Sequence, residues 1–128
     1  MLAVTLADIR LFLHVLAATI WVGGQITLAA LVPLLRGYEG LPKLAARRFN
    51  QIAWTAYAVL IATGVWNMLE LPEDYPGETT LQVKLGFVVL SGVAAFLHTK
   101  AKSKAGLAAW GAIGLLTALG ALFFGIQL

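Results

Sequence analysis

The sequence contains no cysteine, and only 12% of its 128 residues are charged. Without cysteine there is neither a disulfide nor a thiolate metal site, so a bound metal would need histidine, methionine, carboxylate or backbone oxygen. Soluble domains are about 25% charged and about 45–50% apolar. Here 60% of the residues are hydrophobic and the mean hydropathy is +0.86. These values indicate a chain that folds mainly in lipid.

Four apolar segments are long enough to span a bilayer, which takes about 20 residues of helix. They cover approximately 9–35, 48–69, 81–99 and 107–126. The connections between them are short and most carry glycine or proline, so neighbouring helices are expected to run antiparallel. The sequence therefore predicts an all-α fold: one integral membrane domain, residues 1–128, forming an antiparallel bundle of four transmembrane helices. The first helix is long enough to tilt, or to kink near Pro33.

Charge is distributed unevenly among the connections. Seven of the nine basic residues lie in or beside the first and third connections: Arg36, Lys43, Arg47, Arg48, Lys100, Lys102 and Lys104. The second connection is acidic and carries Glu70, Glu73, Asp74 and Glu78. Because basic loops stay on the cytoplasmic side, both termini are expected outside (N-out, C-out), in the plasma (inner) membrane. The N-terminal apolar run lacks a cleavage site before a polar chain, so it is expected to be a structural helix. The clustering also accounts for the net charge of +3, and nucleic acid is not an expected partner.

Polar side chains form two stripes within the apolar segments. Their members recur every three or four residues, or at multiples of that spacing: Arg10, His14, Trp21 and Gln25 in the first segment, and Lys84, Ser91 and His98 in the third. A charged residue at the bilayer centre costs at least about 2.5 kcal/mol. The two stripes are therefore expected to face each other inside the bundle.

Position along the helices divides the polar residues into two groups. The outer group, near the outer leaflet, is predicted to contain Arg10, His14, Asn67, Met68 and Lys84. Fourteen residues separate Lys84 from His98, about 21 Å along a helix, which places His98 in an inner group. The inner group also contains Arg47, Arg48, Asn50 and Gln51. Two axial imidazoles must approach within about 4–5 Å across a heme, so His14 and His98 of one chain cannot share one. A heme would use one histidine, pair His14 with Lys84 or Met68, or bridge two protomers.

The titratable candidates also have structural interpretations. His14 can hydrogen-bond a neighbouring main chain, and Lys84 can extend to the outer interface. His98 lies close to Lys100, as an interfacial residue would.

The remaining candidates are similarly open to two interpretations. Arg48 fits the positive-inside pattern and can also bind a heme propionate. Met68 suits packing as well as ligation. Gly24 lies near Trp21 and would make room for a flat ligand.

The segment from Leu13 to Gly24 resembles the opening helix of the copper-resistance protein D (CopD) domain and of HemJ-type protoporphyrinogen IX oxidases. The likeness to the HemJ type continues through Arg48-Phe49-Asn50, Val83-Lys84-Leu85 and His98, and covers roughly residues 10–100. In that family the first-helix histidine and the third-helix lysine are the functional pair, and the protein is associated with heme b. The resemblance thus implies a functional role for His14 and Lys84. CopD-like domains share the first-helix motif and a third-helix lysine, so the resemblance indicates a superfamily more than one reaction.

The resulting functional prediction is a heme b-binding membrane redox protein, with a porphyrinogen as candidate substrate and a quinone as candidate electron acceptor. His14 is the expected axial ligand, Arg10 and Lys84 would stabilise negative charge, and Trp21 would pack on the macrocycle over Gly24. The further cofactor-binding candidates are Asn67, Arg48 and His98, and His98 is also a candidate metal ligand.

Two other interpretations remain at this stage. In a copper-handling protein, His14, Met68 and Met1 would offer ligands to Cu(I). A structural membrane subunit would have no cofactor. The small residues of the last helix, among them Gly111 and Gly114, suit a contact in a homo-oligomer.

Overall fold

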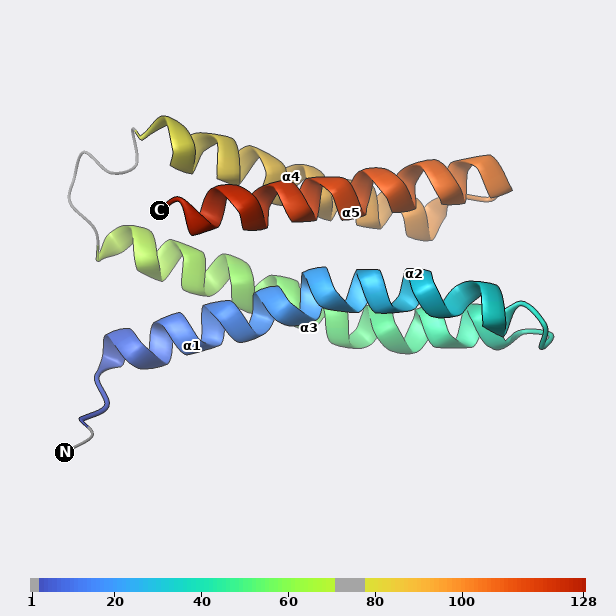
Figure 1. Ribbon diagram of the computed structural model, residues 1–128, viewed down its shortest axis with the longest axis horizontal. Coiled ribbons are helices and arrows are strands. Elements are labelled where there is room, and N and C mark those ends of the chain that lie inside the picture. The colour runs from blue at the N-terminus through green and yellow to red at the C-terminus, as the bar shows by residue number, and fades with distance from the viewer. Residues whose placement is uncertain (1–2, 71–77) are drawn as a thin grey trace. The chain divides into compact units, whose positions relative to one another are not determined.

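The computed structural model describes residues 3–70 and 78–128, and all regular secondary structure in these two ranges is helical. Met1, Glu73 and Asp74, named above as a copper ligand and as acidic loop residues, lie outside the described residues. The elements are α1 (Leu6–Ala18), the π-helical turn η1 (Thr19–Gly23), α2 (Gly24–Leu35), α3 (Leu41–Leu69), α4 (Thr79–Lys100) and α5 (Lys104–Ile126) (Figure 1). The chain forms two compact units, Met1–Leu71 and Pro72–Leu128.

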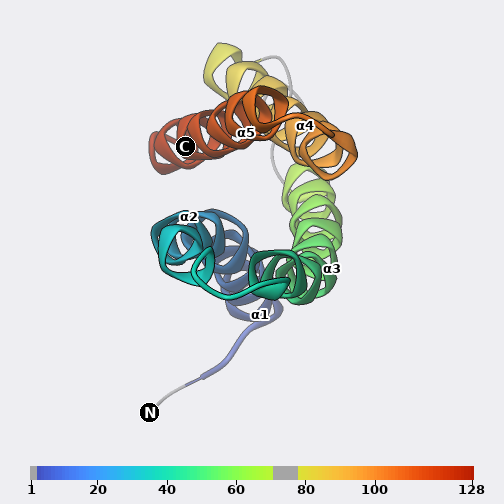
Figure 2. The same cartoon turned by 90° about the vertical axis from the view of Figure 1, so that its right-hand side faces the viewer.

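In the first unit, α1, η1 and α2 form one continuous span that packs antiparallel along α3 (Figures 1 and 2). Thr5 begins this span with a reciprocal capping box: its hydroxyl accepts from the Asp8 main chain at 3.2 Å, and its own N–H donates to Asp8 Oδ2 at 2.9 Å. Together these bonds satisfy two of the N–H groups left unpaired at a helix start. The cap therefore fixes where α1 begins.

The irregularity of the first span lies at η1. A π-helical turn alters the regular i to i−4 pattern, and main-chain groups in lipid need internal partners. Side chains of α2 supply hydrogen-bond donors to two carbonyls of η1. Gln25 Nε2 donates to the carbonyl of Trp21 at 2.9 Å, and Thr27 Oγ1 donates to the carbonyl of Gly23 at 2.8 Å. Pro33, where a kink was expected, lies inside α2.

Helix α3 begins at Leu41, so the predicted start at residue 48 was too late. Pro42 falls in the first turn, where its missing N–H costs no hydrogen bond and its fixed φ suits a helix. Gly40 has φ of 76°, a left-handed conformation that glycine adopts without strain and that ends the connection. The segment 41–47, predicted as loop from its glycine and proline content, is the beginning of the helix.

In the second unit, α4 and α5 form a hairpin (Figure 2). Its buried positions are Leu81 and six small residues: Ser91, Gly92 and Ala94 of α4, and Gly114, Ala118 and Ala121 of α5. Small side chains allow the close helix approach that stabilises membrane hairpins. Ser103 caps α5 by accepting from the main chain of Gly106 at 3.0 Å.

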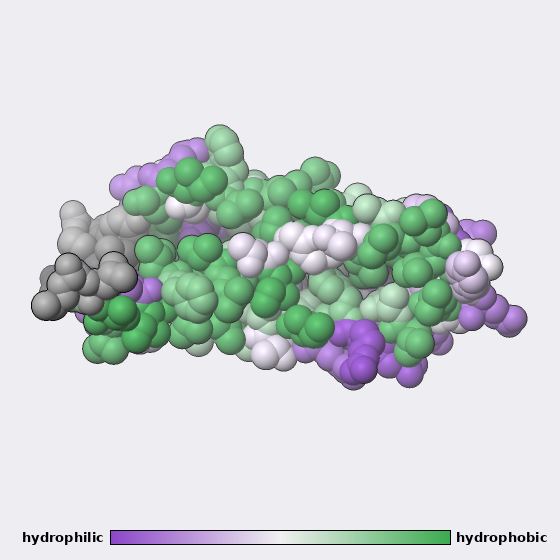
Figure 3. Space-filling view, turned by 60° about the horizontal axis from the view of Figure 1, so that its bottom comes forward, coloured by the Kyte–Doolittle hydropathy of each residue, from purple (hydrophilic) through white to green (hydrophobic). Residues whose placement is uncertain are grey.

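Four helical spans are long and apolar enough to cross a membrane: Leu6–Leu35, Leu41–Leu69, Thr79–Lys100 and Lys104–Ile126. Large apolar side chains lie exposed on them, including Leu116 at 67% and Phe123 at 61%. Figure 3 shows wide hydrophobic areas on the visible face, with hydrophilic residues collected in separate patches. The predicted all-α class and the four apolar spans are confirmed, as expected of a multi-pass membrane protein.

Candidate functional site

The polar centre of the first unit is a hydrogen bond between α1 and α3. His14 Nδ1 lies 2.8 Å from Thr63 Oγ1, and the two residues are 49 positions apart in sequence. Thr63 is only 5% exposed, and His14 is half-buried. The bond therefore fixes the imidazole from a buried position on the facing helix. Thr63 had not been identified as a partner of His14 from the sequence.

The hydrogen bonds of Thr63 favour one tautomer of His14. Thr63 has one hydroxyl hydrogen, and its nearest acceptor is the carbonyl of Val59 at 2.7 Å. With this hydrogen donated to Val59, the Thr63 oxygen accepts from His14, so Nδ1 of the imidazole carries the hydrogen. Nε2 is then the unprotonated nitrogen, which is the form that binds a metal ion. In metal sites the ligating histidine commonly donates its other N–H in this way.

Arg10 lies one helical turn before His14 on the same face of α1. Its guanidinium carbon is 5.8 Å from the ring centroid of Trp66 on α3, within cation–π range. Its Nε is buried and has no hydrogen-bond partner among the described residues. A buried donor without an acceptor costs about 1–3 kcal/mol. A ligand carboxylate reaching Arg10 would remove that cost.

The last two turns of α3 carry the other residues of the predicted outer group that belong to this unit. Asn67 lies one turn beyond Thr63, and both Asn67 and Met68 are half-buried. Gly64 adjoins the imidazole: a Cβ there would lie 3.7 Å from Cε1 of His14, an ordinary contact distance. The edge of the ring between its two nitrogens therefore faces a position with no side chain.

Trp21 lies in an aromatic cluster rather than on an open surface. Its ring centroid is 4.6 Å from that of Tyr57 and 5.4 Å from that of Trp54, both on α3. Trp21 is 4% exposed, and the rings of Trp54 and Tyr57 meet edge to face at 5.6 Å. Tilted and edge-to-face pairs stabilise by about 0.5–1.5 kcal/mol each beyond the area they bury. The cluster holds η1 against α3, so Trp21 has a packing function here.

The space beside Gly24 is also filled. A Cβ at Gly24 would overlap Cε1 of Phe49 and lie 3.1 Å from its Cζ. Gly24 was predicted to make room for a flat ligand; in this structure the ring of Phe49 from α3 lies in that space. Arg48, which precedes Phe49 in the sequence, is exposed.

Lys84 belongs to the second unit and lies against α5. A Cβ at Gly125 would be 3.3 Å from both Cε and Nζ of Lys84. Lys84 is half-buried, so its aliphatic chain covers the surface that Gly125 leaves open. The stacked pair Phe87 and Phe124, with centroids 5.7 Å apart, lies one turn further along α4.

His98 is fixed at the other end of the α4–α5 hairpin. Its Nδ1 lies 2.9 Å from the carbonyl oxygen of Leu107. A carbonyl only accepts, so Nδ1 of His98 carries the hydrogen. A Cβ at Gly111 would lie 3.3 Å from Cε1 and 3.4 Å from Nδ1 of His98. The imidazole therefore closes the turn between the two helices.

No group of three or more histidine, cysteine, aspartate or glutamate side chains that could hold a metal ion occurs in the parts of the chain that are described. A heme needs only one or two protein ligands. The residues around His14 suit that requirement: one imidazole held by Thr63, and one cation with a buried, unsatisfied donor.

Comparisons of the chain with protein-family models, with curated proteins and with solved structures found no match.

Proposed function

We propose that this chain is a multi-pass protein of the plasma membrane that binds heme b through His14 and takes part in redox chemistry of the CopD/HemJ-like type. In this proposal the four spans form an antiparallel bundle with both termini outside. Bound heme b would supply a one-electron redox couple within the membrane. A porphyrinogen is the proposed electron donor, and a quinone the proposed acceptor.

The observation that carries the proposal is the hydrogen bond from His14 Nδ1 to Thr63. It favours the tautomer in which Nε2 would be the ligand nitrogen, and it anchors the ring to a buried residue of α3. Such partners orient a ligating imidazole and raise its basicity. His14 would therefore keep its hydrogen bond to Thr63 while Nε2 serves as an axial ligand.

Arg10 supports a ligand that carries carboxylates. Its position one turn from His14, and the unsatisfied buried Nε, favour a charge-assisted hydrogen bond to a propionate. Lys84 is proposed to supply a second cation from the other hairpin, as the family resemblance implies. His98 is proposed to remain structural, because its Nδ1 bond closes the α4–α5 turn.

The test is an absorption spectrum of the protein purified in detergent after expression with heme supply. The wild type is expected to show a Soret band that shifts on reduction, with iron in the metal analysis. His14→Ala is expected to lose at least nine-tenths of the band, because a lost axial ligand leaves only contacts with the macrocycle and its propionates.

His98→Ala is the matched control and is expected to retain the band, while Arg10→Gln is expected to weaken heme binding without abolishing it. Circular dichroism establishes that each variant is still helical. A helical His14→Ala protein with an undiminished Soret band would reject His14 as the ligand. Copper in place of iron, with no Soret band, would reject the heme proposal altogether.

A further inference from the structure

A shallow hollow lies where the first connection meets α3. Its volume is ≈ 360 Å³ and its lining residues are Glu39, Gly40, Leu41, Lys43, Leu44 and Arg47. This volume is at the lower end of the range of small-molecule sites, about 300–1,000 Å³. The hollow shares no residue with the site around His14.

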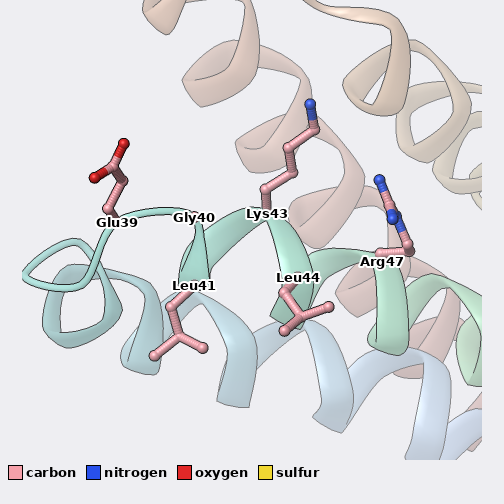
Figure 4. A pocket seen from close by; sticks show the side chains of 6 residues that line it. All are labelled: Glu39, Gly40, Leu41, Lys43, Leu44 and Arg47. Carbon is pink, nitrogen blue, oxygen red and sulfur yellow. The ribbon is translucent and has the colours of Figure 1, made fainter.

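The lining of the hollow separates charge from apolar surface. Figure 4 shows Glu39, Lys43 and Arg47 extending to one side of the chain, and Leu41 and Leu44 extending to the other. Lys43 and Arg47 are four residues apart on α3, so they are neighbours on one face of the helix. Both are exposed, as is Glu39. The charged side thus offers two cations and one carboxylate.

The hollow also lies at one end of an apolar span. The membrane-length helix Leu41–Leu69 begins in it, and Leu44 is 55% exposed. Residues at the end of such a span lie at the depth of the lipid headgroups, where lysine and arginine meet phosphate. The occupant that matches this position has an anionic phosphate, an adjoining cation and apolar chains.

We propose that the hollow binds the headgroup of phosphatidylethanolamine. Lys43 and Arg47 bind the phosphate, Glu39 accepts hydrogen bonds from the primary ammonium, and Leu41 and Leu44 contact the apolar part of the lipid. Phosphatidylcholine fits less well, because its trimethylammonium has no N–H to donate to Glu39. Phosphatidylglycerol offers no cation to that carboxylate. The proposal concerns lipid recognition and does not depend on heme binding.

The first test uses the unaltered protein. Nanodiscs containing equal amounts of phosphatidylethanolamine, its N-methyl and N,N-dimethyl derivatives, phosphatidylcholine and phosphatidylglycerol are extracted with detergent. Lipids retained by the protein are then counted by native mass spectrometry. Retention is expected to fall along the methylation series, by about two- to fivefold overall, because the hydrogen-bond donors to Glu39 are lost while the charge is kept; this is the scale of one exposed polar contact. Equal retention along the series, or a preference for phosphatidylglycerol, would overturn the proposal.

The second test assigns the residues. Glu39→Ala is expected to equalise phosphatidylethanolamine and phosphatidylcholine, because alanine has no acceptor for the ammonium N–H, whereas Lys43→Gln with Arg47→Gln is expected to lower retention of every phospholipid. Lys102→Gln is the control, since Lys102 is an exposed lysine of the connection between α4 and α5, and it should leave the profile unchanged. If Glu39→Ala keeps the wild-type preference, the carboxylate has no part and the assignment fails. A variant that does not fold leaves the decision to the methylation series.

Discussion

The two helical hairpins fix their histidines by different means. In the first, His14 donates to the side chain of Thr63 on the facing helix. In the second, His98 donates to the main-chain carbonyl of Leu107. A main-chain acceptor is present whatever residue occupies the position, whereas the hydroxyl of Thr63 is removed by one substitution. The orientation of His14 therefore depends on which residue occupies position 63 of α3. The orientation of His98 does not depend in this way on the side chain at position 107.

The packing of the first hairpin likewise depends more on particular side chains than the packing of the second. In the first hairpin, aromatic side chains make the contacts: Trp21 of η1 packs against Trp54 and Tyr57 of α3, and Phe49 of α3 packs against Gly24 of α2. Between α4 and α5 the most buried positions are small, with Ser91 at 1% and Ala118 at 1% exposure. Interlocked aromatic rings accept only one arrangement, while small residues stabilise by close approach of the two backbones. The first hairpin is accordingly the one suited to hold a ligand in one orientation.

The largest expected effect of a single methyl group is at Gly24. Gly24→Ala places a Cβ into the ring of Phe49, and overpacking of this kind costs about 1–3 kcal/mol. We expect a lower unfolding temperature in detergent, and recovery in the double variant with Phe49→Leu, because the ring is then absent. Gly23→Ala is the matched control, since nothing lies within 4 Å of its Cβ. Equal destabilisation at both glycines would show that the interlocked packing is not the cause.

The next largest effect is expected on heme affinity when the Thr63 side chain that holds His14 is changed. Thr63→Val keeps the shape and removes the acceptor of His14 Nδ1–H. Loss of such a partner typically lowers metal affinity about 10–100-fold, while the hydrogen bond itself contributes only about 0.6 kcal/mol on average in a membrane protein. Heme titration should therefore show a weaker site in a protein of nearly unchanged stability.

Thr55→Val provides the comparison for that experiment. Thr55 is on the same helix and donates to the carbonyl of Gln51 at 2.9 Å, a local bond that involves no histidine. The Thr55→Val variant should bind heme with the wild-type affinity. If both variants bind heme as the wild type does, Thr63 does not position the ligand.

The number and class of the helices could be predicted from the sequence because hydropathy reports the solvent of each segment directly. The register of the first hairpin could not. Taking 36–47 as loop puts its midpoint between residues 41 and 42, which sets His14 opposite the neighbourhood of Leu69. The connection before Leu41 is centred near Tyr38, and His14 and Thr63 lie almost equally far from it. The misplaced start of α3 thus explains why Asn67 and Met68 were expected beside His14 and Thr63 was not.

Side-chain packing set the other limit. The sequence predicted room for a flat ligand at Gly24, and the planar ring that lies there belongs to Phe49. Nothing in the spacing distinguishes a glycine that faces a ligand from one that faces an aromatic residue of the next helix. The π-helical turn was also missed: Gln25 and Thr27 donate to main-chain carbonyls four residues earlier, but Thr55 and Thr117 do the same within regular α-helix, so such donors do not predict the turn.

The smallest expected effect is in the second hairpin, at the glycine beside His98. A Cβ at Gly111 would lie 3.3 Å from Cε1 of His98, which a shift of a few tenths of an ångström relieves, and alanine gains up to about 1 kcal/mol of helix propensity over glycine. Gly111→Ala should therefore change the unfolding free energy by less than about 1 kcal/mol. The Gly111→Ala protein should be slightly less stable than Gly86→Ala, because nothing lies within 4 Å of a Cβ at Gly86. The imidazole NMR signals of His98 should shift while its hydrogen bond to the main chain persists. A loss of stability at Gly111 as large as that at Gly24 would mean that α4 and α5 are interlocked as tightly as η1 and α3, and the contrast between the hairpins would not hold.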